Sequence, residues 1–84
     1  PPTKVGVAVV DVVAGLLLTG LVLAALHRRE RTGRGEEVET SLLQAAVALL
    51  INVASNSLVT GQVPGRWGNA HPNIVPYQTF ATAD

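Results

Sequence analysis

A long apolar segment with one acid near its beginning constrains this chain more than any other feature. Asp11 is followed by fifteen residues without a formal charge, from Val12 to Leu26, and then by a basic stretch. The segment is rich in Ala, Leu and Val and contains no proline, so it predicts a helix over residues 11–32. The glycines of the following TGRG stretch are candidate C-caps. Such a helix either crosses a membrane or is buried inside a protein.

A buried helix explains the segment better than a membrane span. A spanning helix needs roughly 20 predominantly apolar residues. Extending the run back to Val5 would place Asp11 inside the membrane, which costs about 2.5 to 3.5 kcal/mol on insertion scales. No Trp or Tyr lies near either end of the run to mark the interface with lipid headgroups. We therefore expect a core helix and no membrane contact, with a membrane helix as an alternative.

The whole chain predicts a mostly helical order of elements. The expected elements are a loop or short strand (1–10), a helix (11–32), a weak strand (36–40), a second helix (42–59), a loop (61–75) and the start of a strand (76–82). The second helix has the clearest signals, because Ser41 opens S-L-L-Q, the spacing of a capping box, and Gly61 follows its end.

The composition narrows the classes of function. The 84 residues carry no net charge, which argues against nucleic acid as a partner. The absence of cysteine excludes thiolate metal sites and fits a reducing compartment, so we expect a cytoplasmic protein. His71 has no second His or acid at metal-ligand spacing, so no metal is expected. Because the chain begins with Pro1 and shows no signal peptide, we expect an internal piece of a longer protein.

Asp11 is the candidate catalytic residue. In the structural interpretation it caps the helix, accepting the unpaired N–H groups of the first turn. In the functional interpretation the same position orients a carboxylate, and the helix dipole favours its charged form. Such a carboxylate is a nucleophile for acyl transfer, and the N–H groups are donors for a developing oxyanion. The residues alone leave both interpretations open. The arginines of HRRERTGRG are interpreted as a solvated helix end, because TGRG lacks the spacing of a phosphate-binding P-loop.

Four pieces of the sequence, in order, are VDVVAG, LAALHRRERTGRG, EVETSLLQAA and GNAHPNIVPYQTFATAD. In this order and spacing they resemble the family III CoA-transferases, which include formyl-CoA and carnitine-related CoA-transferases and the α-methylacyl-CoA racemases. The resemblance implies an α/β fold in which this chain is an internal, mostly helical fragment of a Rossmann-like large domain. Residues 1–75 would belong to that domain, and residues 76–84 would begin the crossing toward a smaller domain. It also implies a homodimer of two interlocked subunits.

The resemblance also implies a chemistry for Asp11. Asp11 and Gly15 match the D-x-x-x-G motif, whose Asp attacks the thioester of an acyl-CoA. A mixed anhydride and an aspartyl-CoA thioester follow, and CoA passes to an incoming carboxylic acid. Coenzyme A is thus a substrate, and no permanently bound cofactor is expected. The residues that contact CoA lie mostly upstream in the family, so none is assigned here, and the isolated 84 residues are expected to be inactive.

The racemases of the family are the nearest alternative. They use the matching Asp as an acid/base group, and a glycine cluster typically follows it. Val12, Val13 and Ala14 follow Asp11 here, which favours the transferase. A helical-hairpin interaction module without catalysis is the remaining alternative.

Overall fold

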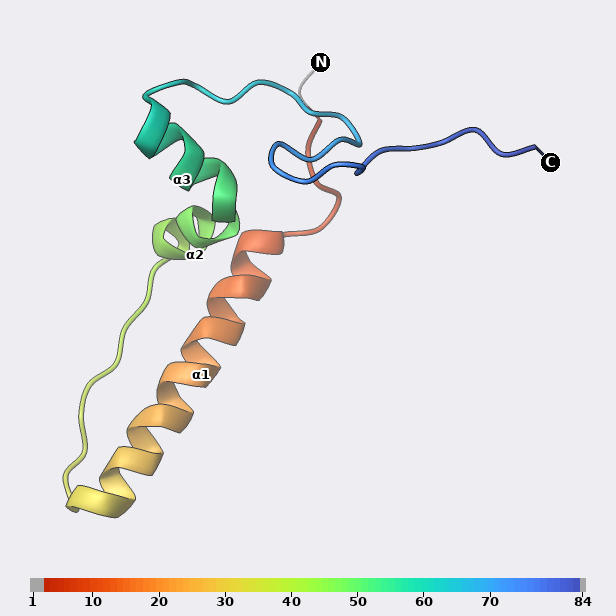
Figure 1. Ribbon diagram of the computed structural model, residues 1–84. Helices are drawn as coiled ribbons and strands as arrows, with labels where there is room; N and C mark the ends of the chain where they lie inside the picture. The colour runs from red at the N-terminus through yellow and green to blue at the C-terminus, as the bar shows by residue number, and fades with distance from the viewer. Residues whose placement is uncertain (1–2, 84) are drawn as a thin grey trace. The chain divides into compact units, whose positions relative to one another are not determined.

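The computed structural model describes residues 3–83, which form three helices (Figure 1). They are α1 (Val9–Thr32), α2 (Leu42–Leu49) and α3 (Ile51–Thr60). The chain divides into two compact units, of which the first ends at Leu50 and the second begins at Ile51. The first unit contains α1 and α2, and the second contains α3 and the irregular segment that follows it.

The first helix begins two residues earlier than the sequence predicted. Its N-cap is Ala8, which has no side-chain capping bond, and the Val12 N–H donates to the Ala8 carbonyl at 3.2 Å. Asp11 is therefore the third residue of α1, and its predicted role as the N-cap is wrong. Val9 and Val10 are poor helix formers, but unlike Pro they do not break a helix. The helix can therefore begin before Asp11.

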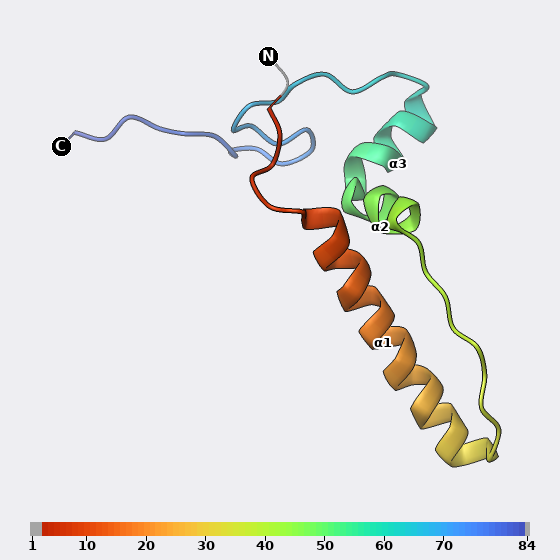
Figure 2. The same cartoon turned by 180° about the vertical axis from the view of Figure 1, so that it is seen from behind.

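The end of α1 is where the TGRG stretch predicted it. Gly33 adopts a left-handed conformation with φ of 70°, and its N–H donates to the Arg29 carbonyl at 2.7 Å. Glycine pays no steric penalty there because it has no Cβ. The chain then runs back along α1 toward α2, as both views show (Figures 1 and 2). An ion pair of 2.8 Å between Arg28 Nη1 and Glu36 Oε2 connects this return segment to α1.

The predicted strands at 36–40 and 76–82 are not present. Neither segment is a strand, and no ladder of backbone hydrogen bonds forms within residues 3–83. A strand exists only when a neighbouring strand satisfies its N–H and C=O groups, and no segment in that range does so. The expected α/β class is therefore not confirmed by the described part of the chain, which is helical.

The second helix begins with the capping box that S-L-L-Q predicted. The Gln44 N–H donates to Ser41 Oγ at 3.1 Å, and the Ser41 N–H donates to Gln44 Oε1 at 3.1 Å. The helix α2 that begins at this cap packs against α1. Ala45, on α2, is the one completely buried residue among residues 3–83.

Removing the cap is expected to weaken α2. Ser41→Ala should lower the free energy of unfolding of the full-length protein by about 1 kcal/mol, because the Gln44 N–H loses its acceptor. Urea unfolding monitored by circular dichroism measures this change. Ser55→Ala is the matched control, because Ser55 lies within α3 and caps no helix; equal losses in the two variants would contradict the role of the cap.

The expected single helix over 42–59 is wrong, because two helices meet there. The Leu50 N–H donates to the Val47 carbonyl at 3.1 Å, one residue short of α-helical spacing. Ile51 then adopts a φ of 46°. A left-handed conformation costs an L-residue with a Cβ about 1–2 kcal/mol. The sequence gives no sign of this break, since Leu50 and Ile51 continue the apolar pattern without Gly or Pro.

The end of α3 and the loop after it are as predicted. Gly61 has a φ of 71°, and its N–H donates to the Ser57 carbonyl at 2.8 Å. Residues 61–75 then form turns and irregular structure. The prediction of a second helix end before Gly61 and of a loop over these residues is confirmed.

The apolar side chains of α1 lie on its surface in this chain. None of its 24 residues is buried. The exposed large apolar residues of α1 are Val12, Leu16, Leu17, Leu18, Leu21, Val22, Leu23 and Leu26. By length and composition alone α1 qualifies as a membrane span. The same properties describe a helix buried on all sides in the core of a larger protein.

Candidate functional site

Asp11 lies in the first turn of α1 with its side chain exposed. The Val9 N–H donates to the Val7 carbonyl at 2.9 Å, and the N–H groups of Val10 and Asp11 have no backbone acceptor within residues 3–83. The first turn of a helix leaves such N–H groups unpaired and carries a partial positive charge. The site thus combines an accessible carboxylate with two N–H donors in the same turn that lack an acceptor in the described part of the chain.

Gly15 leaves open space on the same face of α1 as Asp11. Residues four apart share a helix face, and a Cβ built on Gly15 would meet no atom within 4 Å. Within the described residues no atom fills this space.

The arginine-rich end of α1 is exposed, as the interpretation of a solvated helix end predicts. Arg29 and Arg31 lie in the last turn of α1, where cations are favoured by the helix dipole. Arg28 pairs with Glu36 instead. This pair lies at a cavity of about 390 Å³ that Thr32, Arg34 and Gly35 also line. Exposed ion pairs of this kind contribute little to stability.

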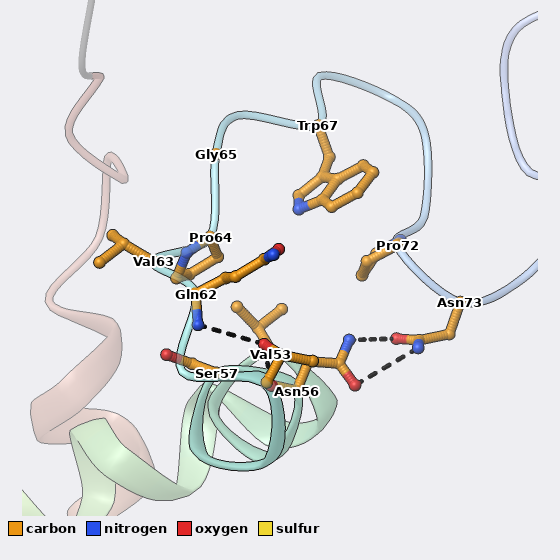
Figure 3. Close-up of a pocket in the computed structure, with 11 residues that line it drawn as sticks. Val53, Asn56, Ser57, Gln62, Val63, Pro64, Gly65, Trp67, Pro72 and Asn73 are labelled. Carbon is orange, nitrogen blue, oxygen red and sulfur yellow. Dashed lines mark hydrogen bonds between the residues drawn. The ribbon is translucent and has the colours of Figure 1, made fainter.

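A network of three asparagines in the second unit was not predicted. Asn73 Oδ1 accepts from Asn52 Nδ2 at 2.6 Å and from Asn56 Nδ2 at 2.8 Å, and Asn73 Nδ2 donates to Asn56 Oδ1 at 3.4 Å. Figure 3 shows the carboxamides of Asn56 and Asn73 facing each other. The signal in the sequence was the spacing of Asn52 and Asn56, which places two amides on one face of α3.

The loop over 61–73 and α3 enclose a cavity of about 360 Å³. The indole of Trp67 and the side chain of Gln62 project toward its interior (Figure 3). None of the residues that line it carries a formal charge. Because Asn73 belongs both to the loop and to the asparagine network, the network holds this loop against α3.

Replacing Asn73 is expected to release the loop. In the full-length protein, Asn73→Ala removes the shared partner of two α3 amides, a loss of about 1–3 kcal/mol in local stability. Trypsin cleavage after Arg66 should therefore become about tenfold faster or more. Asn69→Ala is the control, because Asn69 lies in the same loop and makes no side-chain hydrogen bond within residues 3–83. Equal cleavage in both variants would show that the network does not hold the loop.

Comparison with known proteins identifies relatives over the whole chain. Residues 1–84 match the model of CoA-transferase family III. Succinyl-CoA:glutarate CoA-transferase of Mus musculus is 45% identical over 83 residues, which cover 99% of this chain and 19% of the mouse protein. Succinate–glutarate CoA-transferase of Agrobacterium fabrum is 43% identical over 83 residues, which cover 99% of this chain and 21% of that protein.

The fold also has a solved relative. A crystal structure of a CaiB/BaiF family protein from Brucella suis matches with a TM-score of 0.80 and 44% identity, covering 95% of this chain and 21% of that one. The chain spans about a fifth of the length of the curated relatives. The match to the family model and the identities agree, and the chain therefore belongs to CoA-transferase family III.

Proposed function

We propose that this chain is part of an acyl-CoA:carboxylate CoA-transferase in which Asp11 is the nucleophile. The observation that carries the proposal is the first turn of α1, where an exposed carboxylate lies beside two N–H groups that have no acceptor within residues 3–83. Gly15 leaves open space on the same face. A carboxylate nucleophile divides a difficult acyl transfer into easier steps, and the N–H groups stabilise the oxyanion that forms in each of them.

The proposed reaction regenerates the free carboxylate of Asp11. A carboxylate oxygen of Asp11 attacks the carbonyl carbon of the acyl-CoA, the C–S bond breaks, and CoA leaves as a thiolate, so that a mixed anhydride of Asp11 and the acyl group is formed. The thiolate then attacks the carbonyl carbon of Asp11, which releases the first acid and forms an Asp11–CoA thioester. The acceptor carboxylate displaces CoA from Asp11, forming a second anhydride. Attack of the thiolate on the acceptor carbonyl yields the new acyl-CoA and free Asp11.

The names of the relatives suggest the substrates. The mouse relative is named for succinyl-CoA and glutarate. A relative from Haloarcula hispanica, 42% identical, is named for succinyl-CoA and mesaconate. We therefore propose succinyl-CoA as the donor and a dicarboxylic acid as the acceptor. These relatives are all named as CoA-transferases, which favours the transferase over the racemase.

Membership of the family suggests the domain arrangement, the oligomeric state and the compartment of the proposed enzyme. Residues 1–75 would belong to a large domain and residues 76–84 to the crossing toward a small one, in a cytoplasmic homodimer of interlocked subunits. The remainder of the protein would cover α1 and supply the contacts to CoA. The isolated chain is therefore expected to be inactive.

Trapping the intermediate tests the proposal. The full-length protein is incubated with succinyl-CoA, treated with hydroxylamine or borohydride, digested with trypsin and measured by mass spectrometry. Cleavage after Lys4 and Arg28 releases a peptide over residues 5–28, in which Asp11 is the only side-chain carboxylate. We expect the adduct on this peptide. CoA transfer without any adduct on Asp11 would contradict the proposal, and exchange of an α-hydrogen of a 2-methylacyl-CoA with solvent, without CoA transfer, would indicate the racemase.

A further inference from the structure

The first turn of α1, which carries Asp11, has no side-chain cap. Its N-cap is Ala8, whose side chain makes no capping hydrogen bond. The ends of helices fray, and most of the stability of a helix in a protein comes from packing against its neighbours. The orientation of the Asp11 carboxylate therefore depends on what packs against the first turns of α1.

One face of these turns is packed. Within residues 8–15 the half-buried residues are Val9, Val10, Val13 and Ala14. Residues three or four positions apart share a face of a helix, so these four side chains form one surface, here called the contact face. Asp11 lies outside the contact face and is exposed. The same turns are thus held on one face while the carboxylate projects from another.

The helix that packs against these turns is α2. Within residues 3–83, α1 and α2 are the one pair of helices in contact. Both belong to the unit that ends at Leu50. Both views show α2 beside the beginning of α1 (Figures 1 and 2). We therefore attribute the burial of the contact face to α2.

The contact is made through alanines of α2. Ala45 is completely buried, and Ala46 is the only other residue of α2 that is not exposed. A methyl side chain lets two helices approach closely, because the distance between helix axes depends on the side chains at the contact. A completely buried position in a packed contact has no room for a larger side chain. The size of residue 45 therefore sets how closely α2 approaches α1.

We infer that Ala45 is a positioning residue, which fixes the first turns of α1 and thereby the direction of the Asp11 carboxylate. This inference rests on the proposed function, in which that carboxylate is the nucleophile. A larger side chain at position 45 would push α2 away from α1 or tilt the two helices. Because misplacement of a reacting group by about 1 Å costs about 10²-fold, the attack of Asp11 on the thioester should become slower.

The rate constant and the amplitude of adduct formation separate positioning from stability. The full-length protein is mixed with succinyl-CoA, treated with hydroxylamine after increasing times and digested with trypsin. Mass spectrometry then measures the adduct on the peptide over residues 5–28, which contains Asp11. Displacement of Asp11 lowers the rate constant in every molecule, whereas loss of folded protein lowers only the amplitude.

We expect Ala45→Val to lower the rate constant about 10- to 100-fold at an unchanged amplitude. Ala48→Val is the matched control, because it makes the same change at an exposed residue of the same helix, and its rate constant should equal that of the unmodified protein. Ala45→Gly leaves a gap in the contact instead of crowding it, and it should lower the rate constant at least about threefold.

An unchanged rate constant in Ala45→Val, equal losses in Ala45→Val and Ala48→Val, or a loss of amplitude alone would each overturn the role of Ala45. If Ala45→Val does not fold, an unchanged rate constant in Ala45→Gly would overturn it. These results leave the proposed function intact, because the unmodified protein still forms the adduct. CoA transfer by the unmodified protein without an adduct on Asp11 would instead contradict the proposed function, and the role of Ala45 with it.

Discussion

Replacing Asp11 by Ala in the full-length protein is expected to lower kcat for CoA transfer by at least about 10⁴-fold. In the proposed reaction the variant would lack the oxygen that attacks the thioester, so neither the anhydride nor the Asp11–CoA thioester would form. The change to the helix itself is small, since a first-turn acid contributes about 0.3–1 kcal/mol through the helix dipole. Steady-state transfer from succinyl-CoA to glutarate measures the loss, and urea unfolding confirms that the variant is folded.

The control for this experiment is another exposed acid of the same unit. Glu37 makes no ion pair with a residue between 3 and 83, so Glu37→Gln should retain the activity of the unmodified protein. Asp11→Glu moves the carboxylate by one methylene group and is expected to show intermediate activity, because misplacement of a reacting group by about 1 Å costs about 10²-fold. Activity of Asp11→Ala within tenfold of the unmodified protein would exclude Asp11 as the nucleophile.

Placing an acid in the middle of α1 is expected to destabilise the full-length protein strongly. Leu21 lies in a helix that is apolar on all sides, and we propose that the rest of the protein covers it. Leu21→Asp would then bury an unpaired carboxylate and remove apolar contacts, with a loss of about 3–5 kcal/mol or more. The midpoint of urea unfolding and the yield of soluble protein measure the effect.

A polar position of the same helix provides the comparison. Arg31 lies in the exposed last turn of α1, and Arg31→Gln should change the stability by about 0.5 kcal/mol or less. If Leu21→Asp unfolds at the same urea concentration as the unmodified protein, α1 is not buried in the protein. A need for detergent to keep the unmodified protein in solution would instead support the alternative of a membrane helix.

The elements that short patterns specify could be predicted from the sequence. Gly33 and Gly61 end helices because a residue without Cβ is favoured in a left-handed conformation, and Ser41 with Gln44 forms a cap from groups three residues apart. The break at Ile51 could not be predicted, because a β-branched residue with positive φ contradicts local preference. The strands at 36–40 and 76–82 depend on pairing partners that residues 3–83 do not provide.

The candidate site could also be predicted only in part. The position of Asp11 at the beginning of an apolar helix was evident, although the helix begins at Val9 and Asp11 does not cap it. The contacts of Asn73 with α3 join residues 17 and 21 positions apart in the chain. Such pairs depend on the path of the loop, which no local pattern specifies. The hydrogen bonds that the N–H groups of Asn73 and Ile74 donate to His71 Nδ1 likewise depend on a turn whose geometry was not evident from the sequence.

The length of the return segment determines where α2 lies beside α1. Residues 34–41 are neither helix nor strand and run back along α1 (Figure 1), and at about 3.3 Å per residue a fully extended segment of this length spans about 26 Å. A helix rises about 1.5 Å per residue, so this distance equals about 17 residues of α1. Counted back from Thr32, this distance brings the start of α2 level with about residue 15 of α1, one turn after Asp11. Lengthening or shortening the return segment by one residue would shift this registration by about 3 Å, so the length of the segment determines which turn of α1 lies beside the start of α2.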